Sequence, residues 1–238
     1  DNTSSLYLFP INGHTYNTTT NLLYPTMRIF LDTADVNEVS KRVDTGLISG
    51  VTTNPTLIKK SGRKPSDVYR QLDNLDYITD VSIEVVADTA VQMYEEGITA
   101  SDNYATATIK LPCTVEGLRA CQMLNNEKIR TNVTLVFSPA QAILASLAGA
   151  RYVSPFVGRL DDNSVDGLQL IKDIHELYLP CCQILAASIR DAKSVSKAFI
   201  NGADICTLPP AVFDKMYKHV LTDAGLEQFN KDHAQILT

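Results

Sequence analysis

The chain has no excess of positive charge and no long apolar run. Its 238 residues carry 21 Lys and Arg against 27 Asp and Glu, which gives a formal net charge of −6. Nucleic-acid backbones are bound by basic surfaces, so nucleic acid is not an expected partner. No stretch approaches the roughly twenty apolar residues of a membrane helix, and the first residues lack a signal-peptide pattern. These absences predict a cytoplasmic protein without a membrane partner.

Patterns typical of disulfide frameworks and metal sites are also missing. The five cysteines have no regular spacing, and most lie in or beside apolar runs, as buried unpaired thiols do. The four histidines are scattered, without an H-x-x-x-H or Cys-x-x-Cys companion. We therefore expect chemistry that works without a metal.

From Met27 onward, apolar β-prone segments alternate with amphipathic segments. Strands are predicted over 28–33, 50–55, 81–86, 107–112, 131–136, 152–158, 183–189 and 204–209. Helices are predicted over 35–46, around 68–75 after an irregular Lys-rich turn, and over 89–100, 118–124, 138–149, 166–177 and 195–202. Eight strands that alternate with helices in this way predict a single (β/α)₈ barrel over residues 27–220. An open doubly wound sheet is the alternative, although no G-x-G-x-x-G or P-loop follows any strand.

The two ends of the chain differ from this rhythm. Residues 1–26 are rich in Asn and Thr and show no helical or strand period, so they are interpreted as an extension or leader outside the fold, with Met27 as a candidate natural start. Residues 221–238 predict one extra helix with Leu226 and Phe229 on one face. An apolar face left over after barrel closure is expected to pack on a neighbouring subunit.

Lys110 lies inside the apolar strand that Pro112 ends, where a surface residue is not expected. Burial disfavours the charged form of an amine, so a lysine in such a strand can act as a nucleophile near neutral pH. The alternative is a structural lysine neutralised by an acidic partner, since ion pairs also occur in barrels.

Polar residues also occur on most other predicted strands. In a (β/α)₈ barrel, such residues near the C-terminal ends of several strands converge on one mouth. Those on the other strands are Asp32, Asn54, Glu84, Thr134, Ser154 and Ser188. Two carboxylates around an amine form an acid/base set that can relay protons while the amine attacks a ketone.

Arg159 and Arg190 follow the sixth and seventh strands, each near a serine. Two guanidiniums and two hydroxyls at one edge of the mouth suit a phosphate monoester. The alternative is that each arginine is an ordinary partner in a loop salt bridge.

With these residues in these positions, the sequence resembles a known family, the transaldolases, and within it the small, short-chain branch that also contains fructose-6-phosphate aldolase. The resemblance covers Met27 to about His233. The motifs that carry it are Phe-Leu-Asp-Thr-Ala-Asp at 30–35, Gly-Val-Thr-Thr-Asn-Pro-Thr at 50–56, Thr-Ile-Lys-Leu-Pro at 108–112, Ala-Gly-Ala at 148–150, Ser-Pro-Phe-Val-Gly-Arg at 154–159 and Leu-Ala-Ala-Ser-Ile-Arg at 185–190.

The resemblance implies a cofactor-free transfer of a dihydroxyacetone unit between sugar phosphates through a lysine Schiff base. Lys110 matches the Schiff-base lysine and Asp32 the proton acceptor for the C4 hydroxyl, while Glu84 and Thr134 match the pair that holds a catalytic water. The residues that match substrate-binding positions are Thr53, Asn54, Ser154, Phe156, Arg159, Ser188 and Arg190, with Ser154, Arg159 and Ser188 at the phosphate end. A homo-oligomer, a ring-type pentamer or decamer, is also implied.

Two positions distinguish transferases from aldolases in this branch. The aldolases that release free dihydroxyacetone carry glutamine where Glu84 stands and tyrosine where Phe156 stands, so both residues favour transaldolase. Because Phe156 has no hydroxyl to assist protonation, we hypothesise that the enamine persists until an aldehyde acceptor arrives. The alternatives are a fructose-6-phosphate aldolase and a sugar-phosphate-binding barrel without catalysis.

Overall fold

The structure is a computed structural model that describes residues 27–236. Within them, eight parallel strands form one closed barrel in which each strand pairs with the next and β8 returns to β1. The strands are β1 (Arg28–Asp32), β2 (Ile48–Thr52), β3 (Asp80–Glu84), β4 (Ala107–Pro112), β5 (Thr131–Val136), β6 (Tyr152–Pro155), β7 (Gln183–Ala186) and β8 (Ile205–Leu208). Closure confirms the predicted barrel and rules out the open sheet. The prediction for residues 1–26 lies outside the described residues.

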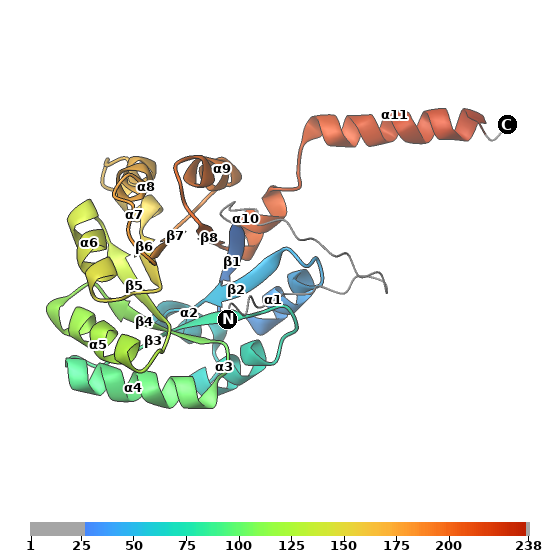
Figure 1. Ribbon diagram of the computed structural model, residues 1–238. Helices are drawn as coiled ribbons and strands as arrows, with labels where there is room; N and C mark the ends of the chain where they lie inside the picture. Colours follow the sequence, from blue (N-terminus) through green and yellow to red (C-terminus); the bar gives the residue numbers. More distant parts are fainter. Residues whose placement is uncertain (1–26, 237–238) are drawn as a thin grey trace, which may run out of the picture.

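Helices surround the barrel and connect its strands (Figure 1). They are α1 (Val36–Val43), α2 (Pro55–Ser61), α3 (Pro65–Asp73), α4 (Ala90–Asn103), α5 (Val115–Asn126), α6 (Pro139–Leu147), α7 (Val157–Asp161), α8 (Gly167–His175), α9 (Ala192–Ile200), α10 (Pro210–Lys215) and α11 (Val220–Ile236). The predicted Lys-rich turn is in fact helix α2. The Asn54 side chain caps its N-terminus by accepting from Leu57 N, and Gly62 ends it at a φ of 68°.

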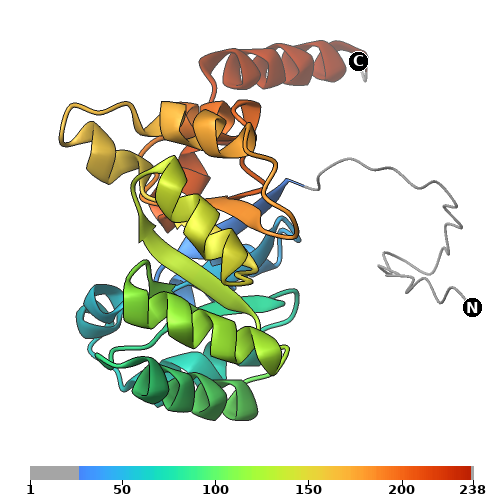
Figure 2. The same ribbon diagram turned by 60° about the vertical axis from the view of Figure 1, so that its left-hand side comes forward.

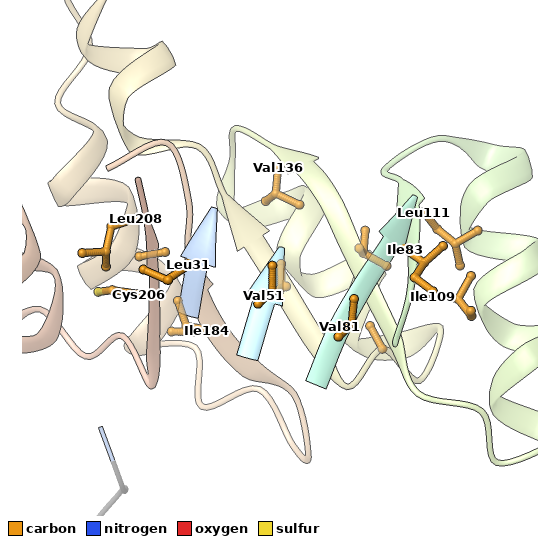
Figure 3. Packing of buried hydrophobic residues seen from close by; sticks show 14 of the residues in the cluster. Leu31, Val51, Val81, Ile83, Ile109, Leu111, Val136, Ile184, Cys206 and Leu208 are labelled. Carbon is orange, nitrogen blue, oxygen red and sulfur yellow. The ribbon is translucent and has the colours of Figure 1, made fainter. Parts of the chain in front are cut away.

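Two apolar cores hold the barrel together. The outer core lies between the strands and the helices, and Figure 3 shows Ile109 and Leu111 of β4 on that side. The second core fills the inside of the barrel and consists of Phe30, Tyr152, Leu185, Ala187 and Ile205. Gly50 makes room for it, because a Cβ there would lie 2.6 Å from the Phe30 ring. Most of this inner core precedes the polar residues along the strands, so it closes the barrel beneath them.

The sixth strand is shorter than predicted. It ends at Pro155, and residues that were expected to continue it form the short helix α7. The chain turns here because the amides of Val157 and Gly158 donate to the carbonyls of Ala187 and Ser188, at the end of β7. A Cβ on Gly158 would meet the Ser188 carbonyl oxygen at 2.4 Å, so only glycine allows this approach.

Helix α11 projects from the barrel in both views (Figures 1 and 2). It begins one residue before the predicted position, and none of its residues is buried. Leu226 and Phe229 are 55% and 70% exposed. The described part of the chain contains no helix that is long and apolar enough to span a membrane.

Candidate functional site

Strand β4 places the Lys110 side chain inside the barrel. Successive side chains of a strand alternate between its two faces, so Ile109 and Leu111 pack outward while Lys110 points inward. Lys110 is 5% exposed. Its Nζ lies 2.9 Å from Glu84 Oε2 and donates to the carbonyl oxygen of Thr53 at 3.1 Å. The amine is therefore fixed from the two preceding strands, and Glu84 is its register partner on β3.

The amine borders a cavity of about 110 Å³ at the C-terminal ends of the strands. This is the end at which the active sites of such barrels lie. Of the eleven residues predicted for the site, seven line the cavity, and an eighth, Glu84, contacts Lys110. The lining consists of Asp32, Thr52, Asn54, Lys110, Asn132, Ser154, Phe156, Arg159, Leu185, Ala187, Ser188 and Thr207.

Asp32 is anchored by a short chain of hydroxyl groups. Thr52 Oγ1 donates to Asp32 Oδ1 at 2.8 Å, and the hydroxyls of Thr52 and Thr207 lie 2.6 Å apart. Burial raises the pKa of Asp32 above its usual value, while the hydrogen bond from Thr52 and the charge of Lys110 act in the opposite direction. The site thus holds a carboxyl group whose proton affinity is increased.

Thr134 carries a hydroxyl group without a partner. Its Oγ1 is buried and has no hydrogen-bond partner among residues 27–236. Thr134 pairs in register with Pro112, two residues after Lys110. A buried unpaired hydroxyl costs about 1–3 kcal/mol, so this group is suited to bind a water or substrate atom.

Thr53 contributes its backbone rather than its side chain to the site. Its hydroxyl donates to the Ser82 carbonyl at 2.9 Å, and it does not line the cavity. Its carbonyl oxygen accepts from Lys110, as described above. Thr53 thus holds the amine from behind the cavity wall.

The two arginines differ in position. Arg159 lines the cavity, and its guanidinium lies 4.8 Å from the centre of the Phe156 ring, which also packs edge-on against Phe137. Within the described residues Arg159 makes no ion pair, so its donors are available to an anion. Arg190 does not line the cavity, because both of its terminal nitrogens bind the carboxylate of Asp162. That pair raises the pKa of Arg190 and lowers the pKa of Asp162.

The two serines also differ. Ser188 lines the cavity with a φ of 61°, a left-handed conformation that non-glycine residues adopt mainly at turns and functional sites. Ser154 is 1% exposed, and its hydroxyl donates to Asn132 Oδ1 at 2.6 Å. Asn132 is the register partner of Lys110. Ser154 of β6 is therefore linked through Asn132 of β5 to the strand that carries the amine, while Arg159 and Ser188 follow the sixth and seventh strands.

Three polar residues of the cavity wall, Thr52, Asn132 and Thr207, were not among the site residues predicted from the sequence. Thr52 and Asn132 each lie two residues before a predicted site residue, so strand alternation places them on the same face. Thr207 is the inward polar residue of β8, the one strand to which sequence analysis assigned none. The two-residue alternation of side chains along a strand could have identified Thr52 and Asn132 if it had been followed from the predicted site residues back toward the start of each strand.

The arrangement bears on the two interpretations of Lys110. The acidic partner that a structural lysine needs is present in Glu84. A purely structural pair, however, does not require a cavity at the amine, a carboxyl group with a raised pKa and an unpaired threonine hydroxyl within the same barrel end. The combination favours a reactive amine.

The fold and this cavity together define a (β/α)₈ barrel with a lysine-centred site at the C-terminal ends of its strands. The family model described as transaldolase/fructose-6-phosphate aldolase matches residues 29–238. The chain therefore belongs to the transaldolase/fructose-6-phosphate aldolase family and is a transaldolase-type enzyme.

Curated relatives agree with this assignment. A probable transaldolase of Caulobacter vibrioides is 50% identical over 211 residues, which cover 87% of this chain and 97% of the relative. A probable transaldolase of Aquifex aeolicus is 46% identical, with coverage of 88% and 98%. A third, from Nitrosopumilus maritimus, is 45% identical, with coverage of 88% and 96%. The match extends over nearly the whole length of each relative.

Proposed function

We propose that the protein is a transaldolase that moves a dihydroxyacetone unit from a ketose phosphate to an aldose phosphate through a Schiff base on Lys110. The donor is fructose 6-phosphate or sedoheptulose 7-phosphate, and the acceptor is erythrose 4-phosphate or glyceraldehyde 3-phosphate. Such a reaction belongs to the pentose phosphate pathway in the cytoplasm. One observation carries the proposal: a buried amine opens into a cavity beside Asp32 and Asn54, which come from two other strands.

In the proposed reaction, the neutral amine of Lys110 attacks the ketone carbon, and protonation and loss of the carbinolamine hydroxyl as water give a protonated imine. Glu84 and Thr134 hold a water molecule that carries protons to and from the carbinolamine oxygen. Asp32 then takes the proton of the C4 hydroxyl while the C3–C4 bond breaks, which releases the aldose and leaves an enamine on the lysine. The enamine carbon attacks the acceptor aldehyde, and Asp32 returns its proton to the new alkoxide oxygen. Water then hydrolyses the resulting imine, which releases the new ketose phosphate and frees the amine of Lys110.

Two residues of the cavity lining support the choice of a phosphorylated substrate. Arg159 offers free guanidinium donors, and Ser188 also lines the cavity. We propose that these two residues bind the phosphate and that Asn54 binds the hydroxyls of the dihydroxyacetone unit. In this proposal Arg190 contributes positive charge at the rim.

Borohydride trapping tests the proposal directly. Incubation with fructose 6-phosphate and borohydride should add a dihydroxyacetone-derived mass to the tryptic peptide that contains Lys110. Lys110→Ala should remain unmodified and lose activity, and treatment without sugar provides the blank. An unmodified wild-type peptide, or an active Lys110→Ala variant, would overturn the Schiff-base mechanism.

An aldolase that releases free dihydroxyacetone is the second candidate, because the matching family contains both activities. Phe156 favours the transferase, since its ring lines the cavity and supplies no proton. An assay with and without erythrose 4-phosphate separates the two. Donor cleavage that needs no acceptor would identify the aldolase.

We also propose that the protein forms a homo-oligomer, for which a ring-type pentamer or decamer is the expected form. Helix α11 buries none of its residues, and its apolar side chains at Leu226 and Phe229 would be covered by a neighbouring copy. Size-exclusion chromatography with and without residues 221–238 tests this contact. An unchanged number of subunits after truncation would contradict it.

A further inference from the structure

Thr207 lies at the far end of the series of hydrogen bonds that runs from Thr207 through Thr52 to Asp32. It is 2% exposed and lies inside the barrel, while its neighbours Cys206 and Leu208 face the outer core (Figure 3). Strand β8 pairs with β1 on one side, and Thr207 is the register partner of Phe30, two residues before Asp32. The barrel closure between its last and first strands therefore brings Thr207 to the carboxyl group.

The donor and acceptor in each of these hydrogen bonds follow from the number of hydroxyl hydrogens. Each threonine hydroxyl has one hydrogen to donate. When Asp32 is ionised, Thr52 donates to it at 2.8 Å, so the 2.6 Å contact with Thr52 must be donated by Thr207. A hydroxyl that accepts a hydrogen bond is a stronger donor in turn, because linked hydrogen bonds polarise one another. Thr207 thus strengthens the bond that favours the carboxylate form of Asp32.

We propose that Thr207 is a positioning residue that acts through Thr52 to keep Asp32 ionised and oriented as the proton acceptor. This inference rests on the proposed function, in which Asp32 takes the proton of the C4 hydroxyl. Burial opposes ionisation of this carboxyl group, and the hydrogen bond from Thr52 counteracts that effect. The charged groups that also act on it are Lys110, which favours the carboxylate, and Glu84, which disfavours it. The three residues come from β1, β2 and β8, so they form one unit only after the barrel has closed.

The test is the pH dependence of kcat/KM in the full-length protein with fructose 6-phosphate and erythrose 4-phosphate. Thr207→Val removes the donor at similar volume. It should lower kcat/KM about 10-fold at neutral pH and shift the acidic limb of the profile to higher pH, with the rate recovering toward wild type in alkaline buffer. Thr207→Ser should restore the wild-type profile, because it restores the hydroxyl.

Two controls separate this role from a general loss of stability. Thr131→Val also removes a buried strand threonine hydroxyl, one that contacts Cys121 on the outer side of the sheet, and it should leave the pH profile unchanged. In an Asp32→Asn background, Thr207→Val should produce no further loss. A loss that is equal at every pH, or one that serine does not repair, would overturn the proposal.

Borohydride trapping distinguishes this failure from a failure of the proposed function. If wild type is trapped on Lys110 and transfers the dihydroxyacetone unit, while Thr207→Val keeps the wild-type pH profile, only the role of Thr207 is wrong. If wild type is not trapped, the Schiff-base reaction itself is wrong, and the role of Thr207 falls with it.

Discussion

The carboxylate of Glu84 and the amine of Lys110 face each other across neighbouring strands at 2.9 Å. Glu84→Gln keeps an oxygen that accepts from Lys110 but removes the group that can carry a proton. We expect kcat for transfer to fall at least about 100-fold, within the range for loss of a general acid or base. Borohydride should still trap a dihydroxyacetone adduct on Lys110. A wild-type kcat in this variant would show that Glu84 only neutralises the lysine.

The unpaired hydroxyl of Thr134 leads to a prediction in which stability and activity move in opposite directions. Thr134→Val replaces a buried hydroxyl without a partner by a methyl group, so the free energy of unfolding should stay equal or rise by up to about 1 kcal/mol. Activity should fall about 10- to 100-fold, because the catalytic water loses one ligand. Urea unfolding and steady-state kinetics measure both effects, and Thr134→Ser should remain close to wild type. A clear loss of stability in the valine variant would mean that the hydroxyl is satisfied in the folded protein.

The alternation of strands and helices could be predicted because buried parallel strands leave long apolar segments separated by amphipathic helices. Lys110 and Asp32 stood out for the same reason, as polar residues in or at the end of such segments. Helix α7 was not predicted, because its start depends on the carbonyls of Ala187 and Ser188, which lie about thirty residues away. Thr207 escaped notice because threonine is common in strands, and only barrel closure brings it to Asp32.

The different positions of the two arginines predict different kinetic effects. Arg159 lines the cavity with free donors, whereas Arg190 is engaged by Asp162 at an exposed position. Arg159→Ala should raise KM for fructose 6-phosphate at least about 10-fold, since charged hydrogen bonds contribute about 1.5–3 kcal/mol. Arg190→Ala should raise it by less than about 3-fold. Unphosphorylated fructose is the control substrate and should respond to neither change. Equal effects of both variants would mean that Arg190 leaves Asp162 when the phosphate binds.

Phe156 and Phe137 form a matched pair for testing the fate of the enamine. Both rings pack edge-on at 5.8 Å, but only Phe156 lines the cavity. Phe156→Tyr introduces a hydroxyl that can protonate the enamine, so release of free dihydroxyacetone without an acceptor should rise about 10- to 100-fold. Phe137→Tyr should leave this side activity unchanged. An enzymatic assay for free dihydroxyacetone measures it, and no rise in the Phe156 variant would remove the explanation for phenylalanine at this position.

Replacing Asp32 with asparagine is expected to raise the stability of the protein and to lower its activity. Burial raises the pKa of this carboxyl group in the folded protein above its value in the unfolded chain. The contribution of Asp32 to the free energy of unfolding is therefore most favourable below the unfolded pKa, and it is lost as the pH rises through the folded pKa. Asp32→Asn should therefore unfold with a free energy about 1 kcal/mol higher than wild type at pH 7.5, and the difference should shrink as the pH approaches about 4. Its kcat/KM should fall at least about 100-fold.

Asp214 provides a control of opposite sign, because its hydrogen bonds with Arg42 lower its pKa. Asp214→Asn should therefore be less stable than wild type at pH 7.5, and the difference should disappear in acid. Urea unfolding at both pH values measures these changes. If Asp32→Asn were less stable than wild type at pH 7.5, the contacts of the Asp32 carboxylate would outweigh the cost of burying its charge.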